Sequence, residues 1–146
     1  MIWYLKNFDE LSPHELYAIL QLRSEVFVVE QQCVFQDMDN KDQVSWHVMG
    51  WNGVSLAAYT RLVPPGITYT EPAIGRVVTS PGVRGGGLGR SLMEYSINQC
   101  YILFGKTTIR IGAQVYLQKF YSSLGFVPAG DLYLEDGIQH IEMILS

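Results

Sequence analysis

Residues 77–91 read Val-Val-Thr-Ser-Pro-Gly-Val-Arg-Gly-Gly-Gly-Leu-Gly-Arg-Ser, and this stretch decides the fold. It predicts the end of an apolar strand, a glycine-rich turn and the first turn of an amphipathic helix. Glycines let the backbone approach a ligand closely and adopt positive φ angles. The helix start adds unpaired N–H groups and the positive end of a dipole, which together suit phosphate groups. The stretch therefore predicts an anion cradle at a strand–helix junction.

Two common phosphate-binding patterns do not fit this cradle. The dinucleotide pattern G-x-G-x-x-G fails because Arg90 stands where the third glycine is required. The Walker pattern fails because Leu88 occupies the lysine position. What remains is Arg84-x-x-Gly87-x-Gly89. A tight strand–helix turn that binds no ligand is the alternative interpretation.

Outward from the cradle, hydrophobic periodicity predicts the other elements. Ser12 followed by Pro13 and Glu15 marks a helix start, and Asn52-Gly53 marks a hairpin turn. Strands are expected over 3–6, 45–51, 54–62, 73–79, 108–113, 126–129 and 138–145, and helices over 13–26, 88–104 and 115–124. This order predicts one mixed sheet flanked by helices.

Composition narrows the classes of protein. The chain has 146 residues, 48% of them hydrophobic and 16% charged, with a net charge of −4. The length predicts one domain over residues 1–146, and the high hydrophobic content excludes a disordered chain. The negative charge disfavours a nucleic-acid binder. The longest apolar runs have five residues, too few for a membrane span. Cys33 and Cys100 lack metal-ligand or redox spacing, so we expect free thiols in a cytoplasmic protein and no metal site, with one disulfide as the alternative.

The cradle resembles a known family motif. Arg84-x-x-Gly87-x-Gly89 is similar to R/Q-x-x-G-x-G/A, the segment of the GNAT acetyltransferase superfamily that binds the pyrophosphate of acetyl-CoA. A later segment is similar to N-x-x-A-x-x-L-Y-x-K-x-G-F of the same family: Gln114-x-x-Leu117-x-x-Phe120-Tyr121-x-Ser123-x-Gly125-Phe126. Tyrosine, glycine and the final phenylalanine keep the family spacing, while glutamine, leucine and serine replace asparagine, alanine and lysine.

Further segments, from about Leu20 to Met143, resemble the ElaA-type branch of that superfamily. They are Arg23-x-x-x-Phe27-Val28-Val29-Glu30-Gln31, Asp37-x-Asp39, His47, Ile74-Gly75-Arg76-Val77-Val78 and Leu134-Glu135-Asp136-Gly137-Ile138-x-His140-Ile141-x-Met143. The resemblance implies the GNAT fold, an α/β (α+β) architecture. Its central sheet is mixed and mostly antiparallel, with about six to seven strands, a splayed parallel pair at 73–79 and 108–113, and about four flanking helices.

By this resemblance, acetyl-CoA is the co-substrate and lies where the two parallel strands separate. The backbone N–H of Val78 is expected to stabilise the oxyanion on the thioester carbonyl, and Tyr121 to protonate the departing thiolate. The alternative for Tyr121 is a core tyrosine, since Leu117 and Leu124 share its helix face. The implied acetyl-CoA contacts are Val77, Val78, Thr79, Arg84, Gly85, Gly86, Gly87, Leu88, Gly89, Arg90, Ser91, Gln114 and Tyr121.

Two histidines and a carboxylate are candidates for the amine end of the reaction. His47 is the candidate general base, because imidazole changes charge near neutral pH. A hydrogen-bonded histidine inside the sheet is the alternative. His140 and Glu142 share one face of the last expected strand and are candidate substrate-binding residues, unless that face is simply solvated.

Carboxylates after the first helix are further candidates. Glu30 follows an apolar run, and we expect it either to recognise substrate or to form a structural ion pair with Arg23 or Arg76. The acidic loop at 36–43 is expected to be solvated, and the functional alternative is a rim that attracts a cationic amine. An EF-hand does not fit, because Asp42 stands where its turn requires glycine.

Motif and resemblance together predict an acetyl-CoA-dependent N-acetyltransferase. Its acceptor is expected to be a primary amine of a small molecule or peptide that attacks acetyl-CoA directly in a ternary complex. A non-catalytic acyl-CoA-binding or partner-binding protein on the same scaffold is the alternative. A nucleotide-phosphate binder is less favoured, since neither nucleotide pattern fits. Dimers are common in the superfamily, so a homodimer is also considered.

Overall fold

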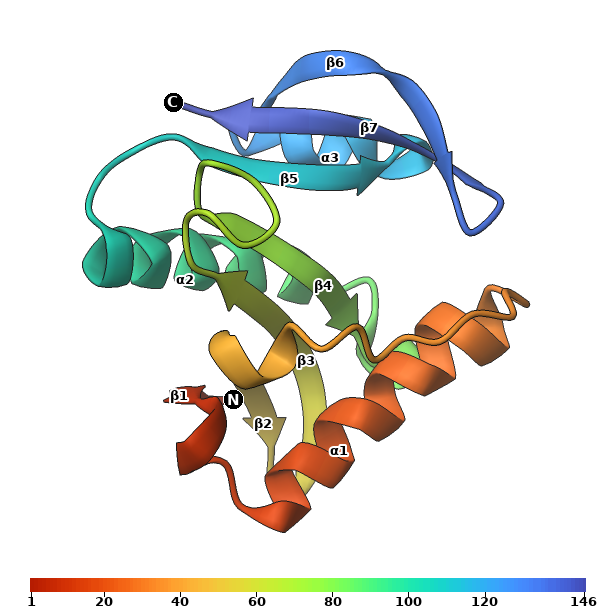
Figure 1. Cartoon of the computed structure of the whole chain (residues 1–146). Coiled ribbons are helices and arrows are strands. Elements are labelled where there is room, and N and C mark those ends of the chain that lie inside the picture. The colour runs from red at the N-terminus through yellow and green to blue at the C-terminus, as the bar shows by residue number, and fades with distance from the viewer.

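The computed structural model describes residues 1–146, and its strands form one seven-stranded sheet in the order β1-β2-β3-β4-β5-β7-β6. The strands are β1 Ile2–Asn7, β2 Trp46–Asn52, β3 Ser55–Val63, β4 Ala73–Thr79, β5 Ile109–Gln114, β6 Val127–Glu135 and β7 Ile138–Leu145. Neighbouring strands are antiparallel except β4 and β5, which are parallel. The mixed sheet with one parallel pair is therefore confirmed, and Figure 1 shows β5, β6 and β7 turned relative to the other strands.

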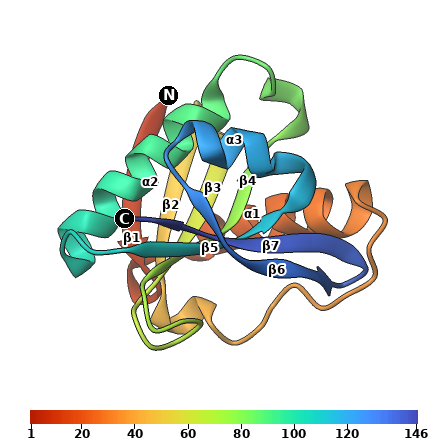
Figure 2. The ribbon, with the colours of Figure 1, turned by 90° about the horizontal axis from the view of Figure 1, so that it is seen from above.

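Helices cover both faces of the sheet. The α-helices are α1 Pro13–Arg23, α2 Leu88–Phe104 and α3 Gln118–Ser123, and short 3-10 turns lie at Phe8–Glu10, Asp42–Val44, Pro81–Val83 and Val115–Leu117. In Figure 1, α1 lies in front of the sheet and α2 behind it, and Figure 2 shows α2 and α3 on the same side. None of these helices is long and apolar enough to cross a membrane.

The hydrophobic core has two parts, one on each face of the sheet, because adjacent residues of a strand point to opposite faces. Val48 and Ala58 belong to the larger cluster, which packs against α2 and α3. Their chain neighbours Met49 and Tyr59 belong to the smaller cluster, which packs against α1. The sheet is therefore buried on both sides near its centre, where β4 lies.

α1 begins where the sequence predicts but leads into a longer helical segment than expected. Ser12 Oγ accepts a hydrogen bond from Glu15 N at 3.1 Å, and Glu15 Oε1 accepts one from Ser12 N at 2.8 Å, so the expected capping box is present. The chain then continues as a π-helical turn, Ser24–Glu30. The β-branched residues Val26, Val28 and Val29 disfavour an α-helix, and an ion pair from Glu30 to Arg84 anchors the end of the wider turn.

The remaining elements match the expected ones closely, with two differences. β6 extends to Glu135 instead of ending near Ala129, because the chain passes Gly130 and Asp131 with an irregularity and not a turn. The helix expected over 115–124 is shorter, because its first residues form a 3-10 turn. Three α-helices and the π-helical turn thus stand where about four helices were expected.

β4 and β5 separate after a single paired position, Ala73 with Arg110. β4 also carries an extra residue relative to β3, because Tyr59 pairs with Val78 while Arg61 pairs with Gly75. The bulge contains Arg76, whose φ of 50° lies in the left-handed region. A bulge bends the strand that carries it, and here it lies where β4 turns away from β5.

Candidate functional site

A cleft of about 980 Å³ opens where β4 and β5 separate. All of β4, Ala73–Thr79, lines one wall, and Ile111, Gly112 and Gln114 of β5 line the other. Residues of the glycine-rich turn, the π-helical turn, α3 and the β6–β7 hairpin also line it. The separation of two parallel strands therefore opens a cleft that residues of several distant segments line.

The glycine-rich turn forms an open backbone cradle at the N-terminus of α2. Gly85 and Gly87 have φ angles of 93° and 78°, and a side chain built at either would meet no atom within 4 Å. Gly87 is the N-cap of α2 and has no side chain that could cap the helix. The first helical hydrogen bond runs from Ser91 N to Gly87 O, so the N–H groups of Leu88, Gly89 and Arg90 have no partner inside the helix. This loop fits an anion such as pyrophosphate.

Not every residue expected in the cradle lines the cleft. Arg84, Gly85, Gly87, Leu88 and Gly89 do, as do Val77 and Thr79 of β4. Gly86, Arg90 and Ser91 are not among the lining residues. The guanidinium of Arg90 instead donates to Ser123 Oγ at 3.2 Å.

Arg84 is held by a carboxylate from the π-helical turn. Its two terminal nitrogens donate to the two oxygens of Glu30 at 2.7 and 2.8 Å. This hydrogen bonding lowers the pKa of Glu30 and raises the pKa of Arg84. The expected structural ion pair of Glu30 exists, but the expected partners, Arg23 and Arg76, are wrong. The first helix and the cradle are thereby joined across the cleft.

The pairing of β4 with β3 turns the N–H of Val78, the expected oxyanion donor, away from the gap between β4 and β5. Ser80 N donates to Ala57 O at 2.8 Å. Hydrogen-bonded pairs alternate along antiparallel strands, so the next such pair is Val78 with Tyr59, and the N–H of Val78 points toward β3. The N–H groups of Val77 and Thr79 point to the other side, where β5 has separated. Val77 is therefore the better-placed donor.

Tyr121 of α3 lines the cleft and is also part of the core, so both interpretations of this residue describe its position. Its side chain is 5% exposed, and its ring makes edge contacts with Phe120 and Phe126 at centroid distances of 5.2 and 6.1 Å. Burial raises the pKa of the phenol. The hydroxyl therefore keeps its proton at neutral pH.

His47, the candidate general base, occupies the position of the alternative interpretation, a hydrogen-bonded histidine inside the sheet. It is 1% exposed and does not line the cleft. Its Nε2 lies 2.9 Å from Asp42 O and its Nδ1 lies 2.6 Å from the Tyr59 hydroxyl. A carbonyl only accepts, so Nε2 donates to Asp42 and Nδ1 accepts from Tyr59. Burial lowers the pKa of His47, which keeps the ring neutral in this position.

His140 reaches the cleft but its expected neighbour Glu142 does not. His140 of β7 is 6% exposed and lines the cleft. Glu142 instead accepts a hydrogen bond from Arg110 at 3.1 Å. The carboxylate near His140 is Glu135 of β6, 3.5 Å from its Nε2. The sequence does contain a signal for Glu135. The two-residue turn Asp136-Gly137 places Tyr133 opposite His140, and Glu135, two residues after Tyr133, lies on the same face of β6.

Two further contacts join the segment after the π-helical turn to the other side of the cleft. Gln31 Nε2 donates to Gln114 Oε1 at 3.0 Å, and Cys33 Sγ lies 3.0 Å from Asp136 O. Gln114 was expected in the site, whereas Gln31 was not singled out by the sequence reasoning. These contacts place residues 31–33 over the ends of β5 and β7.

The aspartates of the acidic loop after the first helix are paired with arginines and not free in solvent, although other residues of the loop are exposed. Asp37, Asp39 and Asp42 pair with arginines from α1, β3 and β4, as follows: Arg23 with Asp37 at 2.8 Å and Asp42 at 2.7 Å, Arg61 with Asp39 at 2.7 Å and Asp42 at 3.0 Å, and Arg76 with Asp37 at 2.8 Å and Asp39 at 3.4 Å. We call these six residues the Arg–Asp cluster. It fixes the loop to the sheet at one end of the cleft.

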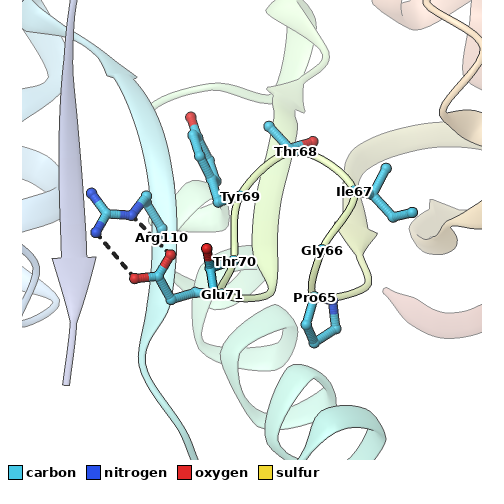
Figure 3. Close-up of a pocket in the computed structure, with 8 residues that line it drawn as sticks. All are labelled: Pro65, Gly66, Ile67, Thr68, Tyr69, Thr70, Glu71 and Arg110. Atoms are coloured by element: carbon cyan, nitrogen blue, oxygen red, sulfur yellow. Dashed lines mark hydrogen bonds and ion pairs between the residues drawn. The ribbon is translucent and has the colours of Figure 1, made fainter.

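A second hollow, of about 690 Å³, lies beside the β3–β4 loop (Figure 3). It is lined by residues 65–71 and Arg110. The Arg110 guanidinium donates to both oxygens of Glu71 at 3.1 Å, so the charges of this hollow neutralise each other. Within residues 1–146, no group of three metal-ligating side chains lies close enough to hold a metal ion. The larger cleft, with its open cradle, is therefore the candidate site.

Comparison with known proteins gives consistent results. Residues 10–146 match the acetyltransferase (GNAT) domain. Protein ElaA of Escherichia coli is 41% identical over 143 residues, covering 97% of this chain and 94% of ElaA. An acyl-CoA N-acyltransferase from Pseudomonas aeruginosa has a crystal structure that superposes with a TM-score of 0.94 at 42% identity, covering 100% of both chains. An aminoglycoside 6′-N-acetyltransferase complexed with coenzyme A shares the fold, with a TM-score of 0.71 at 17% identity, covering 99% and 96%.

Proposed function

Because the chain belongs to the GNAT acetyltransferase family, we propose that it transfers an acetyl group from acetyl-CoA to a primary amine of a small molecule or peptide. One observation carries the proposal. The open backbone cradle and the gap between β4 and β5 line one continuous cleft. Phosphates at the cradle would place the pantetheine arm along β4, with its thioester at the gap. The amine would then attack directly in a ternary complex.

Three groups of this chain would act on the thioester. The N–H of Val77 would donate to the carbonyl oxygen as it becomes an oxyanion, an interaction worth about 10²–10³ in rate. The amine nitrogen forms its bond to the carbonyl carbon while the carbon–sulfur bond breaks. Tyr121 would supply the proton that the departing thiolate needs. Thr79 N–H, two residues along, is available to the pantetheine arm.

Calorimetric titration with acetyl-CoA tests the cradle. Gly89→Glu places a carboxylate in the cleft, where its Cβ meets only Phe120 at an ordinary 3.6 Å. An acidic residue in the first turn suits the helix dipole, so the fold is expected to tolerate it. We expect micromolar binding by the unmodified protein and none by this variant. Gly82→Glu is the matched control, since it adds the same charge in open space outside the cleft.

A thiol-release assay with a panel of primary amines then separates an enzyme from a binding protein. The proposal requires release of coenzyme A that depends on an amine and falls about 100-fold in Tyr121→Phe. Binding of acetyl-CoA without turnover for any amine would favour the non-catalytic alternative. Absence of binding at millimolar acetyl-CoA by folded protein would contradict the proposal.

Location and assembly are part of the same proposal. We place the reaction in the cytoplasm, a reducing compartment that suits the two free, buried thiols Cys33 and Cys100. A homodimer would use the outer strand β6, where Val127, Leu132 and Leu134 are more than half exposed. Light scattering of the purified protein tests this state.

A further inference from the structure

The cleft contains, on β6 and β7, a carboxylate and a histidine that face each other without a proton donor between them. His140 Nδ1 lies 2.7 Å from Ile138 O. A carbonyl oxygen only accepts, so Nδ1 carries the hydrogen and the neutral ring presents a bare lone pair at Nε2. Glu135 Oε2 lies 3.5 Å from that nitrogen. Two acceptors at this distance repel unless a donor or a proton joins them.

The imidazole is held in position by its surroundings. Its side chain is 8% exposed, and the Tyr133 ring stacks on it with centroids 5.6 Å apart. A methyl group built at Gly112 would lie only 2.8 Å from the Tyr133 hydroxyl and 3.2 Å from that of Tyr69. The missing side chain at Gly112 therefore makes room for Tyr133. All of these residues line the cleft.

The pair lies on the side of the sheet from which an acceptor would approach. His140 is directly opposite Gln114 in the β5–β7 pairing, so the two side chains share a face. Gln114 reaches Gln31, at the end of the π-helical turn, so this face is the one that α1 covers. Four residues beyond the single β4–β5 pairing, the strands reach Val77 and Gln114, which therefore flank the gap at a similar level.

We propose that Glu135 and His140 form the binding site for the ammonium group of the acceptor, and that His140 Nε2 removes its proton. This inference rests on the proposed function and deepens it. A primary ammonium has three N–H donors, so one can reach the Glu135 carboxylate while another reaches Nε2. In the transfer, an N–H bond of the ammonium breaks, a bond between the proton and Nε2 forms, and the electron pair stays on the amine nitrogen. The resulting imidazolium is paired with Glu135.

The ammonium site can be tested without knowing the natural acceptor. Protein labelled with ¹⁵N-histidine is titrated with n-propylammonium chloride at constant ionic strength, and the ring nitrogens are observed by long-range ¹H–¹⁵N correlation. The chain has three histidines, so exposed His14 and buried His47 serve as internal references. We expect a saturable shift of His140 Nε2 and none of the other two rings. Tetramethylammonium, a cation without N–H, should leave all three unchanged.

Two conservative variants and one control extend the test. Glu135→Gln should weaken n-propylammonium binding about tenfold, the order expected for losing a charge-assisted hydrogen bond. His140→Asn should lower amine-dependent thiol release but leave the calorimetric affinity for acetyl-CoA unchanged. Glu142→Gln removes a carboxylate from the same sheet face outside the cleft and should change neither quantity.

The outcomes separate this inference from the proposed function. If acetyl-CoA binds but n-propylammonium leaves His140 unshifted, the ammonium site is refuted while the proposed function stands. Equal shifts with tetramethylammonium would also refute it, because they would show charge attraction without hydrogen bonds. If acetyl-CoA does not bind, the proposed function fails whatever the histidine spectrum shows.

Discussion

Replacing Asp42 by asparagine should strongly destabilise the protein, because Asp42 bridges two buried arginines of the Arg–Asp cluster. Its Oδ1 accepts from Arg23 Nη1 at 2.7 Å and from Arg61 Nη1 at 3.0 Å. The side chains of Arg23 and Arg61 are 0% and 5% exposed, so they cannot turn to solvent when the charge is removed. Removing one partner of such a buried pair costs about 3–5 kcal/mol. Asparagine keeps the oxygen but not the charge, so we expect the lower end, about 3 kcal/mol.

Urea unfolding followed by circular dichroism at pH 7 measures this loss. With a denaturant slope of about 2 kcal/mol per molar, the midpoint of Asp42→Asn should fall by about 1.5 M. Asp39→Asn is the graded control, since its side chain is 25% exposed and solvent can replace part of the interaction. A midpoint for Asp42→Asn within about 0.3 M of the unmodified protein would refute the idea that this charge balances the arginines.

Acid titration gives an independent check on the same carboxylate. Burial alone would raise the pKa of Asp42, but the hydrogen bonds and charges of Arg23 and Arg61 outweigh it and hold the pKa below its usual value. The stability from this ionisation is fully present above about pH 4, the unfolded value, and is lost as pH falls through the lower folded value. The stability gap between the unmodified protein and Asp42→Asn should therefore narrow below pH 4. A gap that widens would contradict the assignment.

Three further substitutions probe the site and the sheet. Tyr121→Phe should lower kcat about 100-fold with an unchanged acetyl-CoA dissociation constant, because it removes only the proton for the thiolate; a loss of affinity instead would show that the ring packs against the ligand. Glu30→Gln should tighten acetyl-CoA binding in calorimetry, since it releases the Arg84 guanidinium for phosphate, and weaker binding would show that Glu30 positions that arginine. Gly50→Ala should lower the free energy of unfolding by about 1–3 kcal/mol, because its Cβ would lie 2.8 Å from the Trp3 ring, and an unchanged melting temperature would show that the ring moves aside freely.

Local signals in the sequence predict most of the fold. The glycine-rich turn between β4 and α2 and the capping box of α1 each depend on neighbours within a few residues, and both are present in the structure. The π-helical turn is different, because three β-branched valines at 26, 28 and 29 disfavour a helix and a contact of Glu30 with Arg84, 54 residues away, anchors its end. β6 likewise passes Gly130 because it pairs with β7.

Some features of the candidate site can likewise be predicted from local sequence, and others cannot. The cradle is visible in the sequence because one short stretch supplies all of it. The sequence does not show whether Val77 or Val78 directs its N–H into the gap. That depends on which residues of β3 and β4 are hydrogen-bonded pairs and on the bulge at Arg76. This hydrogen-bonding phase is set by pairing with β3, whose partner residues lie 10–21 positions earlier in the chain, and a shift of one residue reverses which N–H faces the gap.

The net charge of the chain does not show which of its acidic residues are neutralised by ion pairs. An acidic chain with an acidic loop suggests a surface that attracts cations, but the loop's three aspartates are neutralised by arginines from three different elements. Glu30 is neutralised by Arg84 and Glu142 by Arg110. Glu135 is the cleft-lining glutamate whose nearest cationic partner, His140, is charged only when protonated. Selection of a cationic acceptor would therefore depend on the buried imidazole of His140 and the cleft-lining carboxylates beside it, Glu135 and Asp136, and not on the net charge of the chain.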